Sequence, residues 1–397
     1  MLRRTALALV PTSTRRAPAT ARLALSARPR PAPTLALALT AMQPTRPAST
    51  TATPPPPPPL TPWRTHTPAP NASPSTPLVY TFYHDPTATW TYLVVDPLTR
   101  HCAVIDSVLD YDPASRTVST STADSLVAFI DREGLTVDRI LETHAHADHL
   151  TAAAYLQLRL TSSTSSSSSS TSTSSIPIGA HRGMRSTQAH FAQLYDVPPG
   201  ELEHAFDELY DEGDQVRVGN LEGVVWHLPG HTQCSAGYVF GDSVFTGDSV
   251  LLVRPSLSHA SPRWVCALTL APFLLSRFSL ARPQPPTGTA RADFPLGSPS
   301  ALFSSTQRLL ALPSHVRLFS GHSYPLEGSS NLCSATVAQQ RELNPHVHDG
   351  VDEEGFVKMR SERDQGLSEP RLLHQSLQVR PSFLSLSYSL IASDALE

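Results

Sequence analysis

Lysine is almost absent from this sequence: Lys358 is the only one in 397 residues, so arginine carries nearly all of the positive charge. Charged residues of both signs make up only 16% of the chain, and the formal net charge is −4. No basic stripe remains outside the N-terminal region, and proteins that bind a phosphate backbone carry such a stripe. The composition therefore argues against nucleic acid as a partner.

Cysteine is also scarce, with four residues at positions 102, 234, 266 and 333. Their spacings fit neither a disulfide framework nor a CxxC zinc site. We interpret them as buried apolar thiols in a protein of a reducing compartment.

Long apolar runs are missing as well. The apolar stretch that follows residue 253 is interrupted by Pro272 and Arg277, which argues against a membrane-spanning helix. Residues 35–41 are too short and too far from the N-terminus for a secretory signal. We therefore expect no integral membrane segment.

Acidic residues are absent from residues 1–84, which contain nine arginines and many Ala, Leu, Ser and Thr residues. This composition is typical of a mitochondrial transit peptide, because an arginine-studded helix with an apolar face suits import across an energised membrane. The alternative is a disordered tail of biased composition. Residues 43–78, with six prolines at 54–59, have the composition of an extended linker. We predict that residues 1–77 lie outside the folded domain and direct the protein to the mitochondrial matrix.

Hydrophobic periodicity predicts one domain over residues 78–378 that mixes strands and helices. Strands are expected at residues 78–83, 91–95, 102–105, 139–143, 176–180, 215–218, 223–228, 237–240 and 243–246, and helices at 125–132, 151–160 and 184–195. Residues 161–175 are only Ser and Thr, and we expect a solvated surface loop there. Many adjacent strands have tight connections, which favours helices packed outside sheets over a simple alternating parallel fold.

The strongest chemical signal is the segment Thr-His-Ala-His-Ala-Asp-His at residues 143–149. It places His144, His146, Asp148 and His149 within six residues, between a predicted strand and a predicted helix. A loop in that position can turn closely spaced side chains toward one point, which a regular helix or strand cannot do. Imidazole and carboxylate together suit zinc, iron or manganese, so we predict a metal site.

Three further motifs supply donors in the same order along the chain. Leu-Pro-Gly-His-Thr at 228–232 places His231 directly after a strand, and Phe-Thr-Gly-Asp at 245–248 places Asp248 at the end of another. Gly-His-Ser-Tyr at 321–324 contributes His322 and Tyr324. Each motif alone is common turn chemistry, but their order after the histidine-rich loop makes the set specific.

The four motifs in this order resemble the metallo-β-lactamase superfamily. Within it, residues 78–378 are similar to the persulfide dioxygenases (sulfur dioxygenases). The branch-specific segments are Ile-Asp-Ser-Val-Leu-Asp-Tyr-Asp from residue 105, Gly-Thr-Ala-Arg-Ala-Asp-Phe from 288, and Leu-Asn-Pro from 343 followed by Glu-Gly-Phe-Val from 354. The resemblance implies an α/β fold, the metallo-β-lactamase αββα sandwich, with two mixed sheets flanked by helices and the metal at the edge where the sheets meet.

The dioxygenase resemblance implies a single Fe(II) per chain, held by His144, His231 and Asp248. Two histidines and one carboxylate on one face leave open positions for substrate and O₂. The implied reaction oxidises glutathione persulfide with O₂ to sulfite and glutathione, in mitochondrial sulfide catabolism. Whether the protein forms a homo-oligomer does not follow from the sequence.

Other residues receive roles from the same resemblance. Tyr324 matches a position where its hydroxyl hydrogen-bonds the bound sulfur or oxygen, and Arg291 matches a position that meets a glutathione carboxylate. The residues with two possible roles are His146, Asp148, His149 and His322. They either orient ligands and water in the dioxygenase, or complete a second metal site in hydrolases of the superfamily. Ser323 replaces the acidic residue usual between this histidine and tyrosine.

Two alternative functions remain. A two-zinc glutathione thioester hydrolase like glyoxalase II has the same fold and the same donor residues. The segments after Asp248 favour the dioxygenase branch over it. A non-catalytic binding protein would have lost at least one donor, and none is missing from this sequence.

The largest departure from the family pattern is an insertion at residues 253–284, whose removal restores the family spacing. It begins Val-Arg-Pro-Ser and ends in Gln, and these residues allow the bases GT and AG that occur at intron ends. Val-Arg-Pro-Ser recurs at 379, where the resemblance stops and the tail 379–397 begins. Our hypothesis is that both segments are translated introns. The alternative is a genuine lineage-specific loop and tail.

Overall fold

The computed structural model describes residues 58–165, 175–198, 202, 204–252, 288–325 and 330–378. The chain divides into units 1–54 and 55–397, and every element below belongs to the second unit. Residues 1–57 of the predicted targeting segment, the insertion 253–284, the tail 379–397 and most of the Ser/Thr run lie outside the described residues. No described helix has the length and apolar character needed to cross a membrane.

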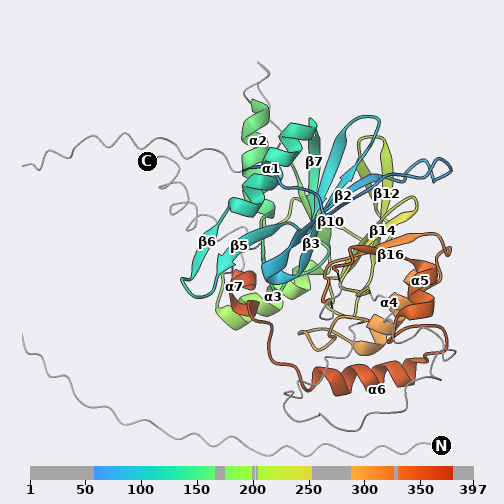
Figure 1. Cartoon of the computed structure of the whole chain (residues 1–397). Coiled ribbons are helices and arrows are strands. Elements are labelled where there is room, and N and C mark those ends of the chain that lie inside the picture. The colour runs from blue at the N-terminus through green and yellow to red at the C-terminus, as the bar shows by residue number, and fades with distance from the viewer. Residues whose placement is uncertain are drawn as a thin grey trace, which may run out of the picture. The chain divides into compact units, whose positions relative to one another are not determined.

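Two sheets of mixed strand direction form the centre of the domain (Figure 1). The seven-stranded sheet has the order β1 (Arg64–His66), β2 (Leu78–His84), β3 (Thr89–Val95), β4 (His101–Ile105), β7 (Thr136–Leu141), β9 (Ile178–His181) and β10 (Glu208–Tyr210). The six-stranded sheet has the order β11 (Gln215–Val218), β12 (Leu221–His227), β13 (Ala236–Phe240), β14 (Ser243–Gly247), β15 (Arg317–Ser320) and β16 (Ser334–Thr336). Parallel pairing joins β4 to β7, β7 to β9, β9 to β10, and β14 to β15; the other pairs in these two sheets are antiparallel. A small third sheet contains β6 (Thr117–Ser119), β5 (Val108–Asp112) and β8 (Leu150–Thr151).

The facing surfaces of the two large sheets share one apolar core. Trp90 and Tyr92 from β3 meet Tyr238, Phe245 and Phe319 from the second sheet, and all five are at most 1% exposed. Strands that are buried on both faces read as continuous apolar runs, and β3 is buried along its whole length.

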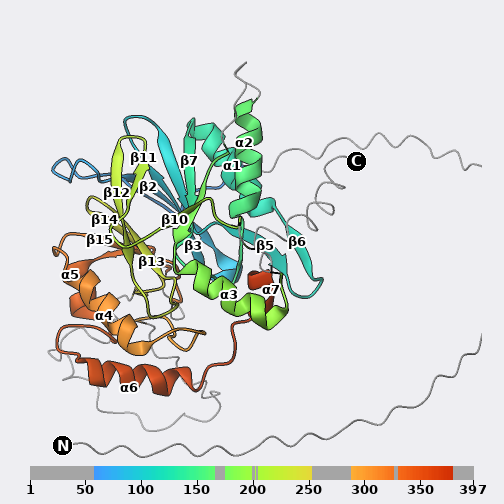
Figure 2. The same ribbon diagram turned by 180° about the vertical axis from the view of Figure 1, so that it is seen from behind.

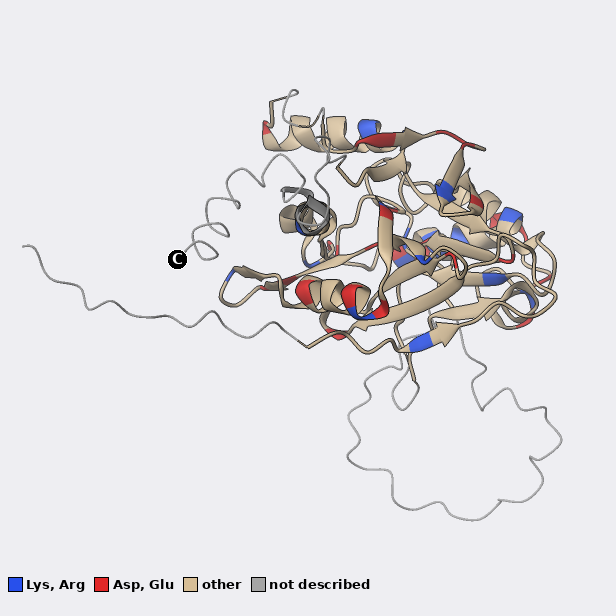
Figure 3. Cartoon of the chain, turned by 90° about the horizontal axis from the view of Figure 1, so that it is seen from above, with Lys and Arg blue, Asp and Glu red and all other residues tan. Residues whose placement is uncertain are grey.

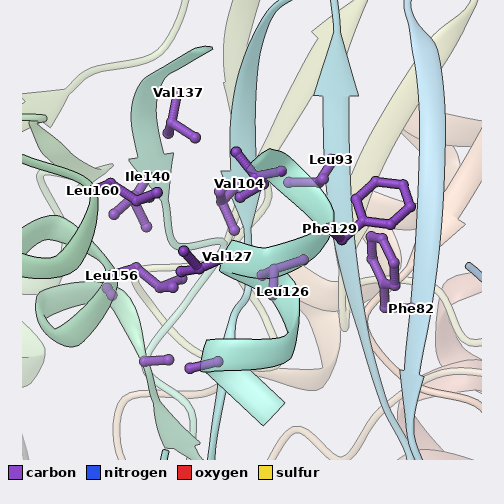
Figure 4. Close-up of a cluster of buried hydrophobic side chains, with 14 of the residues drawn as sticks. Phe82, Leu93, Val104, Leu126, Val127, Phe129, Val137, Ile140, Leu156 and Leu160 are labelled. Carbon is purple, nitrogen blue, oxygen red and sulfur yellow. The ribbon is translucent and has the colours of Figure 1, made fainter. Parts of the chain in front are cut away.

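Helices cover both outer faces, as Figures 1 and 2 show. The helices of the described residues are α1 (Ser121–Glu133), α2 (Ala153–Ser165), α3 (Met184–Tyr195), α4 (Pro299–Leu310), α5 (Val337–Leu343), α6 (Glu353–Asp364) and α7 (Leu373–Gln378), and a 3-10 turn lies at Asp85–Thr87. In the cluster of Figure 4, Phe129 of α1 and Leu156 of α2 pack on Leu93 and Val104 of the first sheet. On the other side, Leu309 of α4 packs with residues of β14 and β15. The predicted αββα sandwich is therefore confirmed.

Helix α6 packs against α4 on the side away from the sheets (Figure 1). Phe356 of α6 packs with Leu302 of α4 and with Ala292, so α6 closes over the residues that follow the insertion. Positions of Lys and Arg and positions of Asp and Glu both occur throughout the described part of the chain, so neither sign is confined to one segment of it (Figure 3).

The nine predicted strands and the helix at 184–195 match the structure to within three residues. Hydrophobic periodicity did not predict β5, β6, β8, β10, β15, β16 and helices α4 to α7, and the remaining errors lie at element ends. The first strand starts earlier than residue 78, because β1 pairs with β2 from within the expected linker. Helix α1 starts at Ser121 rather than at 125. Helix α2 runs on to Ser165, so the loop expected from 161 was wrong over its first five residues. Propagating an existing helix by a turn costs little even for Ser and Thr, because the nucleus is already formed.

Candidate metal centre

Four loops bring their donors together where strands end. The loop of residues 142–149 follows β7, His231 lies between β12 and β13, Asp248 directly follows β14, and His322 lies just beyond β15. Because β14 and β15 run parallel, their carboxyl ends deliver Asp248 and His322 to the same edge. The predicted convergence of these motifs is observed.

Glycines in two of the motifs allow this close approach. Gly247 has φ +49°, and a side-chain carbon there would lie 2.5 Å from Thr143 Oγ1, the residue that precedes His144. Gly230 has φ +142°, and a side-chain carbon there would overlap the backbone of Leu302 in α4. Both positions need a residue without Cβ, so each glycine is required to place the adjacent donor.

His144, His231 and Asp248 form one donor set whose ligand atoms all lie within 4.8 Å of one another. Asp248 Oδ2 is 3.9 Å from His144 Nε2 and 3.7 Å from His231 Nε2. All three residues are at most 8% exposed. The three residues predicted as metal ligands are therefore in contact range of a single ion.

Hydrogen bonds on the far side of the rings fix which nitrogen faces this set. Thr143 Oγ1 donates to Asp106 Oδ2 at 2.7 Å, and it accepts from His144 Nδ1 at 2.9 Å. His231 Nδ1 donates to the Arg291 carbonyl at 2.7 Å. In both rings the proton is on Nδ1, which leaves the Nε2 lone pair for a metal.

A second donor set lies next to the first. One donor atom each of His146, Asp148 and His149 lies within 4.8 Å of the others. His322 Nε2 is 3.1 Å from Asp148 Oδ2 and 3.6 Å from Asp248 Oδ2, so His322 stands between the two sets. The four residues with alternative predicted roles thus form one cluster with the predicted ligands.

His146 differs from the other histidines because two buried carboxylates hold its ring. Its Nε2 contacts Glu142 Oε2 at 2.9 Å and Asp106 Oδ1 at 3.1 Å. Burial disfavours a charged ring, but these carboxylates outweigh it and raise the pKa of His146 well above its usual value. For His144, burial together with the neighbouring His146 and His231 holds the pKa well below its usual value. His144 is therefore neutral at physiological pH, as a metal ligand must be.

Several polar atoms of the site are buried and have no hydrogen-bond partner among the described residues. They are His144 Nε2, His146 Nδ1, both ring nitrogens of His149, and Asp248 Oδ1. Buried polar atoms without partners are costly, and these point into one cluster from different loops. A bound cation would satisfy them, so the residues fit a metal.

The sequence pattern of the metallo-beta-lactamase superfamily matches residues 84–322, which include all of these donors. The chain belongs to the metallo-beta-lactamase superfamily. The match covers more than half of the chain, and the metal-binding His/Asp cluster lies inside it.

Curated relatives of this chain carry names that point to different activities within the superfamily. The chain is 37% identical over 305 residues to a beta-lactamase hydrolase-like protein of Xylella fastidiosa, covering 77% of this chain and 60% of that protein. It therefore spans about 60% of the length of this first relative. It is 33% identical over 300 residues to glyoxylase B2 of Dictyostelium discoideum, covering 74% of this chain and 86% of that protein.

The persulfide dioxygenase branch is represented by more distant matches. Persulfide dioxygenase ETHE1 of Mus musculus is 24% identical over 292 residues, which is 73% of this chain and 82% of that protein. The crystal structure of ETHE1 from Myxococcus xanthus superposes with a TM-score of 0.52 and 25% identity, covering 76% of this chain and 96% of that chain. These matches are consistent with the predicted branch of the superfamily.

Tyr324 lies at the exposed side of this superfamily site. Its ring stacks on His322 with centroids 5.6 Å apart, and half of its surface is exposed. Partial burial and the nearby carboxylates Asp148 and Asp248 raise the pKa of Tyr324, so the phenol keeps its proton. It can therefore act as a hydrogen-bond donor beside the metal cluster.

Arg291, which is predicted to meet a substrate carboxylate, lies in the segment beside His231. Its guanidinium contacts both carboxylate oxygens of Asp293, at 2.6 and 2.7 Å, and donates to the Ser368 carbonyl. The side chain is thus already paired within the chain, and its substrate contact stays a prediction. The contact with the site is made instead by the Arg291 carbonyl, through His231.

Sequence reasoning missed three residues that support the site. Asp106 and Glu142 hold His146, and Thr143 links Asp106 to His144. Asp106 has a left-handed backbone with φ +50° directly after β4, and Glu142 directly follows β7. A carboxylate immediately after a buried strand was the available signal for both.

Proposed function

We propose that this protein is an iron-dependent persulfide dioxygenase that oxidises glutathione persulfide with O₂ to sulfite and glutathione. The observation that carries the proposal is the preassembled set of two histidines and one carboxylate, His144, His231 and Asp248. Such a set with open positions is typical of non-haem Fe(II) oxygenases. When bound, ferrous iron supplies neighbouring positions for a soft sulfur donor and for O₂.

The overall reaction balances without a further reductant. The terminal sulfur of the persulfide is oxidised to sulfite and O₂ is the oxidant that is reduced. One water supplies the third oxygen, and the sulfur–sulfur bond breaks to return the thiol with a proton. Two protons are released overall, so the protein must bind the persulfide sulfur near the metal and offer groups there that can hold and pass on a proton.

The residues around the donor set fit these tasks. Thr143 and the Arg291 carbonyl hold the two ligand rings with Nε2 toward the metal position. The protonated Tyr324 offers a hydrogen bond to sulfur or oxygen. Phe294 lies beside His231, with ring centroids 6.2 Å apart, and gives the site one apolar wall.

A second candidate is a two-zinc hydrolase of glutathione thioesters. The donor set of His146, Asp148 and His149 favours it, because these atoms lie within 4.8 Å of one another and His322 stands close to both sets. A two-zinc centre would generate a hydroxide that attacks a thioester carbonyl. The similarity to glyoxylase B2 supports the same alternative.

Metal content and activity measured on the same purified full chain separate the two candidates. For the dioxygenase we expect about one iron per chain and O₂ uptake with glutathione persulfide. Both should be lost in His144→Ala. Two zinc ions per chain, with thioester hydrolysis and no O₂ uptake, would overturn the dioxygenase in favour of the hydrolase.

We also propose that the arginine-rich N-terminal residues direct the protein to the mitochondrial matrix. The proposal rests on composition, since residues 1–84 contain no acidic residue. Import of the full chain into isolated mitochondria, followed by protease treatment, tests it. A chain that stays protease-sensitive and unprocessed contradicts it.

A further inference from the structure

The metal ligand His231 depends on a segment with no regular structure of its own. Its Nδ1 donates to the carbonyl of Arg291, in residues 288–293, which belong to no helix or strand. A loop backbone has many accessible conformations, so a single carbonyl in it orients a ligand well only if other contacts fix it. The contacts that fix this segment therefore bear on the metal site.

Helix α6 supplies two of these contacts, one on each side of Arg291. Asp364 Oδ2 accepts from the Ala292 amide at 2.8 Å, and Arg360 Nη1 donates to the Thr289 carbonyl at 3.2 Å. Arg360 and Asp364 also pair with each other, with Nε to Oδ1 at 3.0 Å. The Ala292 amide and the Arg291 carbonyl belong to one peptide group, so Asp364 holds the same peptide group that faces His231, while Arg360 holds the Thr289 carbonyl two residues earlier.

The burial of this pair is unusual for charged residues. Arg360 is 2% exposed and Asp364 is 5% exposed. Removing two charges from water costs several kcal/mol per ion, and a buried pair often adds little net stability compared with apolar residues. The hydrogen bonds from this pair to the Thr289 carbonyl and the Ala292 amide instead specify one position for residues 289–292.

We propose that Arg360 and Asp364 of α6 are positioning residues for the metal ligand His231, acting through the backbone of residues 289–292. The inference rests on the metal site of the proposed function, and it applies to either metal. It links the C-terminal helix to a ligand on the loop between β12 and β13. The fixed carbonyl holds the proton of His231 on Nδ1 and keeps Nε2 toward Asp248.

Asp364→Asn tests the proposal, because it removes the charge that holds Arg360 while changing few atoms. The matched control is Asp349→Asn, which removes the partner of Arg341 in an exposed ion pair of the same C-terminal region. We would titrate each metal-free full chain with Co²⁺, reading affinity and the visible ligand-field spectrum. We expect about 10- to 100-fold weaker binding and an altered spectrum for Asp364→Asn, and wild-type behaviour for Asp349→Asn.

A structural role alone would give a different result. Asp364→Asn would then lower the melting temperature of the metal-free chain but bind Co²⁺ with wild-type affinity and spectrum, which overturns the proposal. If Asp364→Asn does not fold, Arg360→Lys decides, since it keeps the charge but loses the forked contacts. We expect weaker binding there too, and unchanged binding overturns the proposal. Failure of the wild-type chain to bind Co²⁺ at all would instead refute the metal site itself.

Discussion

At the scale of single residues, three histidines of the cluster have one ring nitrogen hydrogen-bonded away from it. His144 donates to Thr143, His231 to the Arg291 carbonyl, and His322 Nδ1 to the Ala88 carbonyl at 3.2 Å. The partners are fixed by packing, so the tautomers are set before any metal binds. This preorganisation lowers the cost of assembling the site.

Thr143→Val should weaken metal binding, because valine has nearly the shape of threonine but cannot accept from His144 or donate to Asp106. We expect about a 10-fold loss of affinity, in the lower part of the range for residues that orient metal ligands. Chelator competition on the purified chain measures it. Thr143→Ser keeps the hydroxyl and should bind nearly as the wild type, and equal affinity of the valine and serine variants would contradict the role of the hydroxyl.

At the scale of elements, the turn after β12 that contains Gly230 contacts the start of helix α4. Helix α4 begins with Ser298 as its N-cap, whose side chain accepts from the Ala301 amide. The Ser298 amide donates to the Gly230 carbonyl at 2.8 Å, and Ser305 donates to the Pro229 carbonyl at 2.7 Å. The turn that carries His231 is therefore packed directly on the first turns of α4.

Gly230→Ala should destabilise the fold by about 3 kcal/mol, the sum of an unfavourable positive φ and an overlap with the Leu302 backbone. It should also reduce metal binding, since His231 is the next residue. Gly213→Ala is the matched control: Gly213 has φ +86° but open space around its Cβ position, so only the backbone cost of about 1 kcal/mol applies. Urea unfolding of both variants gives the comparison, and equal losses would rule out the contact with α4.

At the scale of the whole domain, the C-terminal residues complete a site whose donors come from the sheets. Asn344 Nδ2 donates to the Gly288 carbonyl at 2.8 Å, and His346 Nδ1 accepts from the Thr289 amide at 3.0 Å. The segments Gly-Thr-Ala-Arg and Leu-Asn-Pro, which the sequence marked as specific to one branch, are therefore packed against each other.

His346 should make global stability fall in mild acid. Burial, together with Arg363 and Arg360, lowers its pKa to about 3, whereas an unfolded histidine titrates near 6.5. As the pH falls below 6.5 the unfolded chain binds a proton that the folded chain does not, so stability decreases until the pH reaches about 3. At pH 5 this single group should cost about 2 kcal/mol relative to pH 8.

Urea unfolding at several pH values, on the wild type and on His346→Asn, isolates this effect. The asparagine oxygen can accept from Thr289 as Nδ1 does, but it does not titrate. We expect a smaller loss of stability between pH 8 and pH 5 in the variant. Identical slopes for the two proteins would show that His346 is not responsible.

The fold and the donors were predictable because their signals are local. Nine of the strands and α3 follow from hydrophobic periodicity, and the choice of His144, His231 and Asp248 follows from the resemblance that their motifs carry. The ends of α1 and α2 were less accurate, because helix ends depend on small differences between capping, propensity and packing. The first strand, β1, was missed because it lies in a proline-rich stretch and is only three residues long.

The sequence by itself determined the superfamily, because four motifs occur in a fixed order along the chain, and the resemblance to that superfamily supplied the layered architecture and the candidate metal ligands. Only the tertiary structure decided which ring nitrogens face the metal, that Asp106 and Glu142 hold His146, and that Arg291 contributes its carbonyl to the site while its guanidinium pairs with Asp293. These outcomes depend on contacts between residues distant in sequence, such as His231 with Arg291 and Ala292 with Asp364. No local pattern encodes such a contact, because it forms only when packing brings the segments together.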